Sequence, residues 1–426
     1  MAAYAAQRQP TKPTQGSTAS MLTLCLSIKT KTTMKKAMII TIGTGFGVDN
    51  GVAFSVRQQN PDLLCFIYSK ESEKTLEAVL TKLSKKREDV LLKQFDEIND
   101  VEILYQEYSK YIDQILRKGY LPNEVVADYT SGTKSMSSAL VSSAIAKEVG
   151  VLSYVYGLRD EQGRVISDTE RLSPLSPNAI FTEQKIKLFK QLFNRYQFDS
   201  AFELLHNTTI HYNFRDLTNF YLGLSKAYAE WDIFNFKQAS EQLNSINAEV
   251  ATQLQLKKLV ENHKAKLHKL KQANEQGKLS EDDLTDLFSN AIRRFEEGKY
   301  DDCVARLYRL VEMVSQIEFE KEFQMTTDKV KIDILPDSLK ERFVANQQIE
   351  LGLLDTFKVL NEKSENKRTK TFFAKFDDFK KLLSVRNHSR LAHGQRPITK
   401  ETCDKLISFI QEVFEIKDRT DFPKLK

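Results

Sequence analysis

The stretch Glu124–Gly150, EVVADYTSGTKSMSSALVSSAIAKEVG, contains an apolar run, a polar loop and a small-residue segment in that order. The run Val125-Val126-Ala127 predicts a buried strand, and the segment 135–149 predicts a helix. The loop between them, 128–134, brings backbone N–H groups, three serine and threonine hydroxyls and the Lys134 ammonium group to the N-terminus of that helix. Because a helix N-terminus carries partial positive charge, we interpret the loop as a phosphate site.

Two alternatives to a phosphate site were weighed for this loop. In a purely structural interpretation, Gly132 only lets the chain turn, and serine and threonine only cap the helix. The second alternative is an NTPase P-loop, and the sequence argues against it. Ala127 stands where a Walker motif needs its first glycine, and Lys134 follows Thr133 instead of a glycine.

A second glycine-containing loop follows an apolar run near the start of the folded region. The run 37–42 predicts a strand, and it leads directly into Gly43-Thr44-Gly45-Phe46-Gly47. First strands of open α/β sheets approach phosphates at such turns. The spacing does not favour NAD, because Val48 replaces the last glycine of a dinucleotide fingerprint and no acidic residue ends the second strand, 63–68.

The order of apolar runs predicts an α/β fold over residues 34–180. Strands are expected at 37–42, 63–68, 90–95, 125–127 and 151–156, with helices at 71–83, 100–117 and 135–149, and with a hairpin at Gly163 that pairs 164–166. Such alternation is typical of a Rossmann-like, mostly parallel sheet with both faces covered. The loops 43–47 and 130–134 both leave carboxyl ends of strands, which form the binding edge of such sheets.

Beyond residue 173 the chain predicts helices almost throughout. The segment Ser173-Pro174-Leu175-Ser176-Pro177 is interpreted as a linker. Three long helical stretches are expected within 183–278, and a helix pair broken near Gly298 is expected at 286–319. The predicted domains are a disordered tail (1–33), the sheet domain (34–180), a helical middle (181–278) and a C-terminal helical domain (279–420).

Composition excludes several classes of protein. With 426 residues, 41% of them hydrophobic, the chain can build more than one core. Residues 1–36 hold six Lys and Arg and no acid, so the remainder is close to neutral despite a net charge of +5, and a broad nucleic-acid-binding face is not expected. No apolar run is long enough to span a membrane, and no secretion signal is evident. Four scattered cysteines indicate a reducing compartment, so we predict a cytoplasmic protein.

Metal and disulfide sites are not predicted. The histidines lie five apart, at 206 and 211 and again at 263 and 268, whereas two ligands on one helix need a spacing of three or four. The cysteines form no CxxC pair and are far apart: Cys25, Cys65, Cys303 and Cys403.

The segment Thr371–Gly394, TFFAKFDDFKKLLSVRNHSRLAHG, carries an apolar stripe that ends in basic residues. The stripe predicts a helix in which Arg386 and His393, seven positions apart, share a face. A core stripe that ends in arginine and histidine is the kind of departure that functional sites make. The structural alternative is an exposed helix end that Gly394 terminates.

Together, the two loops and this last segment resemble a known family. A Rossmann-like domain with G-T-G after its first strand and T-S-G-T-K-S-M after a later one resembles the CARF domains of CRISPR-associated proteins. The C-terminal Arg-Asn-x5-His resembles the HEPN ribonucleases. This order over residues 34–420 is that of the CARF–HEPN effector ribonucleases of type III CRISPR systems, which act in antiviral defence.

The resemblance implies a homodimer that binds cyclic oligoadenylate as an allosteric activator and cuts single-stranded RNA. It implies ligand contacts from both loops: Gly43, Thr44, Gly45, Thr130, Ser131, Gly132, Thr133 and Lys134. His393 would act as general acid/base, Arg386 would stabilise developing charge, and Asn387 would orient the pair. No metal or cofactor would be needed, and the product would end in a 2′,3′-cyclic phosphate. His388 is a rival for the base, but it would point to nearly the opposite side of the helix.

Three other functions stay open from the sequence. A non-catalytic CARF-type regulator would bind a partner or nucleic acid through its helices. A nucleotide-dependent enzyme of the sheet domain would need an acidic residue after strand 63–68 or a carboxylate cluster. A HEPN toxin would cut RNA without any second messenger.

Overall fold

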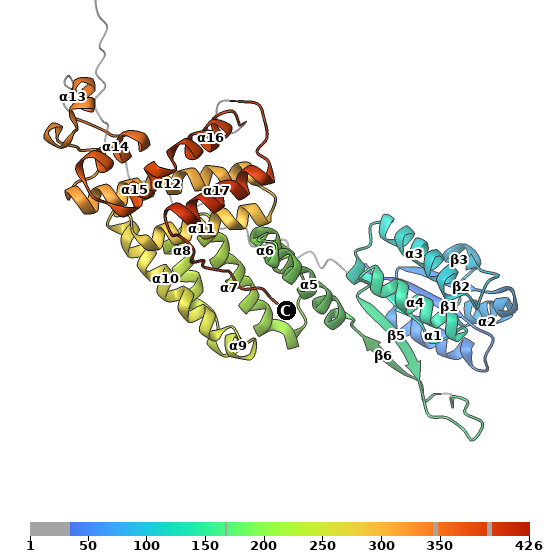
Figure 1. Cartoon of the computed structure of the whole chain (residues 1–426). Coiled ribbons are helices and arrows are strands. Elements are labelled where there is room, and N and C mark those ends of the chain that lie inside the picture. The colour runs from blue at the N-terminus through green and yellow to red at the C-terminus, as the bar shows by residue number, and fades with distance from the viewer. Residues whose placement is uncertain (1–34, 167, 344–347, 390–393) are drawn as a thin grey trace, which may run out of the picture. The chain divides into compact units, whose positions relative to one another are not determined.

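The computed structural model describes residues 35–166, 168–343, 348–389 and 394–426 (Figure 1). The described chain divides into two compact units, called here the sheet unit and the helical unit. The boundary along the chain lies between Pro177 and Asn178. The predicted disordered tail, 1–33, lies outside the described residues.

The sheet unit contains a six-stranded sheet in the order β3-β2-β1-β4-β5-β6. The first five strands of this order run parallel, and β6 runs antiparallel to β5. The predicted mostly parallel, Rossmann-like sheet is therefore confirmed. The strands are β1 (Ala37–Ile42), β2 (Leu63–Tyr68), β3 (Leu91–Gln94), β4 (Val125–Asp128), β5 (Val151–Tyr156) and β6 (Arg171–Leu175).

Helices cover both faces of this sheet. Side chains of α3 and α4 pack with Ala37 and Ile39 of β1, whereas side chains of α1 and α2 pack with Met38 and Ile40. Successive side chains of a strand point to opposite faces, so an entirely apolar strand serves both layers. The helices are α1 (Val48–Gln59), α2 (Glu73–Leu83), α3 (Val101–Arg117) and α4 (Lys134–Ala146).

The predicted hairpin at Gly163 is confirmed, whereas part of the predicted linker is a strand. A hairpin forms at Gly163, where Val165 bridges Arg159 in antiparallel fashion. The Asp160 N–H donates to the Arg164 carbonyl at 2.9 Å, and the Ile166 N–H donates to the Leu158 carbonyl at 2.8 Å. The strand that pairs with β5 is β6, which includes the first part of the predicted linker. Pro174 fits there because an edge strand does not need every N–H as a donor.

The helical unit begins with shorter helices than predicted. Two of the three expected long helices are each split in two, at Tyr196 (φ 62°) and at Phe234 (φ 66°). Left-handed backbone ends a helix, and no glycine marks either position. The helices are α5 (Asn178–Asn194), α6 (Phe198–His206), α7 (Arg215–Asp232), α8 (Phe236–Ser245), α9 (Ala248–Gln253) and α10 (Lys257–Glu275).

The C-terminal helices form a second core in this unit. The predicted helix pair is confirmed as α11 and α12, which are longer than expected. Inside this core the Cys303 and Cys403 sulfurs lie 2.7 Å apart. The helices are α11 (Glu281–Glu296), α12 (Tyr300–Phe323), α13 (Asp337–Phe343), α14 (Leu353–Lys363), α15 (Lys367–Ala374), α16 (Phe376–Asn387) and α17 (Lys400–Val413).

The last residues of the chain pack back on the middle helices. Phe422 and Leu425 are buried in the core of α5–α10. The Leu425 N–H donates to Asn194 Oδ1 at 2.7 Å, and Asn194 Nδ2 donates to the Leu425 carbonyl at 2.8 Å. The middle helices therefore share one core with the C-terminal segment.

Neither a membrane-spanning helix nor a metal cluster occurs in the part of the chain that the structure describes. His263, one of the paired histidines, is buried and shares a hydrogen bond of 2.6 Å with the Tyr228 hydroxyl. It is a core residue.

Candidate functional site

The two sequence-predicted loops of the sheet unit lie against each other at the carboxyl ends of β1 and β4. The Gly43 N–H donates to Ser131 Oγ at 2.7 Å, and the Thr41 hydroxyl donates to the Ser131 carbonyl. A Cβ on Gly43 would lie 2.7 Å from the Gly132 nitrogen, so the approach requires glycine. Adjacent parallel strands explain the meeting, because their carboxyl ends share one edge.

The hydroxyls of loop 130–134 hold the loop in place. Thr130 Oγ1 accepts a hydrogen bond from the Val155 N–H at 2.9 Å. Thr133 Oγ1 donates to the Ile98 carbonyl at 2.8 Å and accepts from the Met136 N–H at 3.2 Å, which caps α4. These bonds fix the direction of the backbone N–H groups at the start of α4, where the helix has no internal partners for them.

Thr44 and Lys134 contribute the groups that remain available. Both side chains are exposed, and neither has a hydrogen-bond or ion-pair partner within the described ranges. An ammonium group beside a helix N-terminus adds to the positive potential there. A phosphate at this edge would thus meet fixed backbone donors and a free hydroxyl, and Lys134 adds a free cation on the first residue of α4.

Asp128 is a site residue whose place the sequence did not indicate. It was expected in the polar loop, but it is the last residue of β4 and fully buried. Its carboxylate accepts hydrogen bonds from the Ser55 hydroxyl and, at 2.9 Å, from the Thr130 N–H. Burial raises the pKa of Asp128 despite these bonds. The residue holds Thr130 in position, and its partner Ser55 is too distant in sequence to be paired from a local pattern.

Two hollows flank loop 130–134. One, of about 350 Å³, is lined by every predicted ligand residue except Lys134, and also by Ser69 and Glu71. The other, of about 340 Å³, shares Thr130 and Ser131 with the first and extends toward the β5–β6 hairpin. The predicted ligand residues are therefore brought together, with Lys134 outside the lining.

The second predicted site lies at the end of α16. The Arg386 guanidinium carbon lies 4.6 Å from the ring centroid of Tyr308 on α12, and Arg386 Nη1 donates to Asn387 Oδ1 at 3.1 Å. His393 lies outside the described residues, as does Arg390. The structure therefore places two of the three predicted catalytic residues side by side.

The expected continuous helix through this site is wrong. α16 ends at Asn387, and the rival base His388 caps it by donating from Nδ1–H to the Ser384 carbonyl at 2.7 Å. The argument that Arg386 and His393 share a face of one helix therefore does not apply. Gly394 does not end the helix either. It donates to the Ser389 carbonyl at 3.0 Å and lies so close to the His388 backbone that a Cβ would collide with it.

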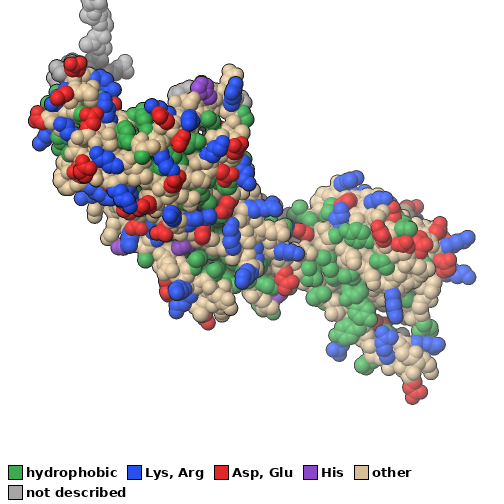
Figure 2. All heavy atoms as spheres, in the orientation of Figure 1, with side chains coloured by type: hydrophobic (Ala, Val, Ile, Leu, Met, Phe, Trp, Pro, Cys, Tyr) green, Lys and Arg blue, Asp and Glu red, His purple; other side chains and the backbone are tan. Residues whose placement is uncertain are grey.

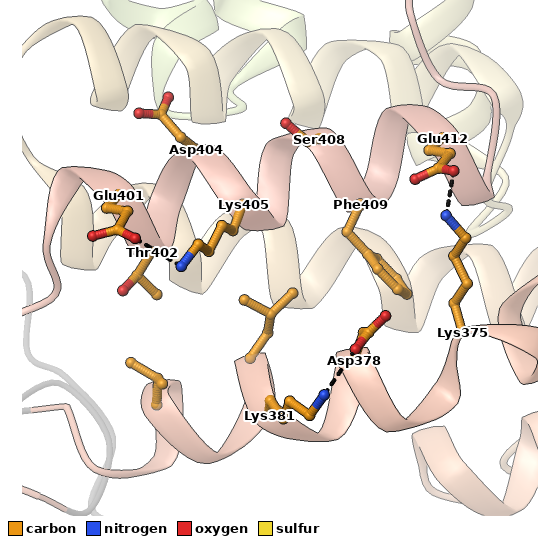
Figure 3. A pocket seen from close by; sticks show the side chains of 12 residues that line it. Lys375, Asp378, Lys381, Glu401, Thr402, Asp404, Lys405, Ser408, Phe409 and Glu412 are labelled. Carbon is orange, nitrogen blue, oxygen red and sulfur yellow. Dashed lines mark hydrogen bonds and ion pairs between the residues drawn. The ribbon is translucent and has the colours of Figure 1, made fainter.

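A cavity of about 570 Å³ lies between α16 and α17, and Val385, next to Arg386 in the chain, is among the residues that line it (Figure 3). Its rim carries ion pairs that join Lys375 to Glu412, Lys381 to Asp378 and Lys405 to Glu401. Neither Arg386 nor Asn387 lines it. Paired charges around an apolar floor leave little net field for an anion, so this cavity is not part of the candidate site.

Comparison with known proteins gives two domain matches and similarity to solved structures. Residues 181–275 match the family described as the Csm6 6H domain, and residues 273–417 match the family described as the Csm6 HEPN domain. The fold is similar to that of Enterococcus italicus Csm6 bound to cyclic hexa-2′-fluoro-hexa-dAMP, with a TM-score of 0.57 and 13% identity over 90% of this chain and 95% of that one. No curated protein matches by sequence.

Proposed function

We propose, from the premise that this chain belongs to the Csm6-type CARF–HEPN effectors of type III CRISPR systems, that it is a cyclic oligoadenylate-activated endoribonuclease. Its substrate would be single-stranded RNA in the cytoplasm, and its role antiviral defence. The observation that carries the proposal is the pairing of Arg386 with Asn387 inside the region that matches the Csm6 HEPN domain. We assign residues 34–180 to the CARF domain, 181–278 to the helical middle and 279–420 to the HEPN domain.

The activator would bind at the sheet edge. The similar Enterococcus italicus protein is bound to a ring of six nucleotides, and cyclic oligoadenylate is the same class of molecule. Internal hydrogen bonds fix loops 43–45 and 130–134, so the backbone N–H groups at the start of α4 and the free Thr44 hydroxyl are held ready as donors. Such donors suit phosphates and ribose hydroxyls without a large net charge.

The RNA chemistry would take place at the end of α16 and need no metal. His393 takes the proton of the RNA 2′-OH, the 2′ oxygen attacks the adjacent phosphorus, and the bond to the 5′ oxygen breaks. Protonated His393 then acts as general acid and gives its proton to the leaving 5′ oxygen, so the products carry a 2′,3′-cyclic phosphate and a 5′-OH. Arg386 stabilises the added negative charge, and Asn387 holds the guanidinium through its 3.1 Å hydrogen bond.

A homodimer would complete both sites. Each protomer supplies one Arg386 and one His393 to a shared HEPN site. Figure 2 shows hydrophobic side chains gathered on part of the sheet unit, near β5 and β6. Exposed apolar side chains of that unit include Val101, Ile103, Tyr105, Tyr156, Leu158 and Leu175. A contiguous apolar surface is typical of a protein interface, which supports pairing of the CARF domains.

The proposal is tested by cleavage of a fluorophore-quencher RNA in EDTA, with and without cyclic tri-, tetra- and hexa-adenylate. We expect activation by one ring size and loss of at least about 100-fold in His393→Ala. His388→Ala tests the rival base and should retain most activity. His206→Ala, which removes an exposed histidine of α6, is the matched control.

Other outcomes would select the alternatives. Cleavage without any ring would indicate a HEPN toxin. Tight binding of one ring without cleavage under any condition would indicate a non-catalytic regulator. Loss in His388→Ala together with retention in His393→Ala would move the base to His388.

A further inference from the structure

The hollow on the β5–β6 side of loop 130–134 contains an unusual exposed aromatic side chain. Phe46 follows the G-T-G turn and is 77% exposed, the highest exposed fraction among the large hydrophobic side chains described. The guanidinium carbon of Arg164 lies 4.9 Å from the centre of its ring. An aromatic ring that is open to solvent on a binding edge and backed by a guanidinium group is a platform on which a nucleobase can stack.

The hairpin that carries Arg164 is held by its own turn. Asp160 Oδ1 accepts from the N–H groups of Gln162 and Arg164, at 3.0 and 2.8 Å, and Arg159 donates to the Gly163 carbonyl at 2.6 Å. Arg164 has no carboxylate partner among the described residues. The turn thus fixes the position of Arg164 in the hairpin, and its guanidinium charge remains available to a ligand.

Glu170 gives the same hollow an acceptor. Its half-buried side chain lines the hollow and has no hydrogen-bond or ion-pair partner in the described chain. An ionised carboxylate only accepts hydrogen bonds. Adenine presents an amino group at position 6, whereas hypoxanthine presents an oxygen there and a donor only at N1. A carboxylate placed opposite position 6 therefore favours adenine.

We propose that this hollow is the subsite for one adenine base of the activator, and the proposal rests on the proposed function. Phe46 stacks on the base, Arg164 supports the stack, and Glu170 accepts the amino hydrogens. The hollow shares Thr130 and Ser131 with the neighbouring hollow of about 350 Å³. The phosphate and the base of one nucleotide therefore bind on the two sides of the same loop.

Titration calorimetry with cyclic tri-, tetra- and hexa-adenylate tests the stacking. For the ring that binds wild type, Phe46→Ala should raise Kd roughly 5- to 100-fold, the range seen when a base loses its aromatic partner. Phe46→Trp should restore binding. Tyr212→Ala, which removes another exposed aromatic side chain from the helical unit, is the matched control. A melting curve of each variant confirms that it is folded.

A ring of the same size that contains hypoxanthine tests the acceptor. Wild type should bind the adenine ring about 10-fold more tightly than the hypoxanthine ring, because the Glu170 carboxylate and the ring oxygen repel each other. Glu170→Gln should narrow this ratio, since a rotated amide can donate to the oxygen. Arg171→Ala, an exposed residue of β6 outside the hollow, should leave the ratio unchanged.

The outcomes separate the subsite from the function. An unchanged Kd in Phe46→Ala, with wild type still activated by the ring, overturns the stacking and leaves the proposed function standing. An unchanged base ratio in Glu170→Gln overturns the role of that carboxylate. If wild type binds no ring at all, the subsite and the proposed function both fail.

Discussion

The two candidate sites are constructed in opposite ways. At the sheet edge, the two loops are held together by hydrogen bonds between segments far apart in sequence. The Gly43 N–H, for example, donates to Ser131, which lies 88 residues away. At the end of α16, the described residues are sequence neighbours, and Arg386 is held by Asn387 and by the ring of Tyr308. The first site consists largely of backbone and the second of side-chain functional groups. Ligand binding at the sheet edge should therefore be sensitive to substitutions that add atoms. Cleavage at the end of α16 should be sensitive to substitutions that remove a charge.

The largest effect is expected from Arg386→Ala, which should abolish RNA cleavage without changing ring binding. Arg386→Ala removes the charge that the proposed reaction needs, so RNA cleavage should fall by at least about 100-fold. The Kd for the activating ring should stay at the wild-type value, because that site lies in the other unit. Cleavage is measured at saturating ring, and Kd by calorimetry. Arg309→Ala, which removes an exposed arginine from α12, is the control. A large change in Kd would show that the two sites are not independent in this way.

A smaller effect is expected when a single methyl group is added at the sheet edge. In Gly43→Ala the new Cβ would lie 2.7 Å from the Gly132 nitrogen, so the two loops must separate. We expect the ring concentration for half-maximal activation to rise about 10-fold, with the maximal cleavage rate retained. Gly352→Ala is the control, because its Cβ would meet no atom within 4 Å. Equal behaviour of the two variants would mean that the close approach does not shape the site.

The helical unit also contains two buried groups whose responses to acid are opposite. Burial lowers the pKa of His263 to about 4 and raises that of Asp286 to about 6, from ordinary values of 6.5 and 3.8. The stability from neutral His263 is present above pH 6.5 and is lost as the pH falls toward 4. The stability from protonated Asp286 is present at low pH and is lost as the pH rises through 6. Between pH 7 and pH 5 the two changes largely offset each other.

Asp286→Asn should therefore expose the histidine effect. Asparagine can still accept the 2.8 Å hydrogen bond from Trp231 Nε1, but it does not titrate. The free energy of unfolding of this variant should fall by about 2 kcal/mol from pH 7 to pH 5, and that of wild type by less than about 1 kcal/mol. The fluorescence of Trp231, the single tryptophan, reports urea unfolding of this unit alone. Equal pH dependence in the two proteins would contradict the assignment.

The smallest expected effect concerns the support of Arg386. Tyr308→Ala removes the ring beneath the guanidinium, and cleavage should fall roughly 2- to 5-fold. Tyr308→Phe keeps the ring and should stay close to wild type in rate. If both variants lost the same activity, the hydroxyl rather than the ring would be the important group. Ring binding at the sheet edge should change in neither.

Sequence predicted the sheet better than the helices. β1 and β2 have the predicted bounds, because a wholly apolar run with clear polar flanks leaves little choice of register. The helix ends at Tyr196 and Phe234 were missed, since a bulky residue in left-handed backbone gives no local signal. Pro174 was taken as a linker residue because its tolerance in β6 depends on that strand being an edge.

The candidate sites were predictable as far as local pattern reaches. Loops 43–47 and 130–134 were expected at one edge, and they meet there. The sequence did not show which loop hydroxyls form hydrogen bonds within the protein. Thr130 bonds to β5 and Thr133 bonds to Ile98, and both partners are distant in sequence. The end of α16 was missed because the helical spacing of the apolar and basic residues continues past Asn387. The hydrogen bond from the Gly394 N–H to the Ser389 carbonyl gives no such signal in the sequence. The roles of Arg386, Asn387 and His393 stay predictions.

The buried positions of Phe422 and Leu425 have a consequence for synthesis of the chain on the ribosome. The core of α5–α10 includes both side chains, and Asn194 pairs with the backbone of Leu425. Domains that depend only on their own residues can fold as they emerge, but these middle helices cannot complete their packing until residues 422–425 have left the exit tunnel. The sheet unit has its own cores and no such dependence. A chain that stops before these residues would therefore carry a complete sheet unit and an incompletely packed helical unit.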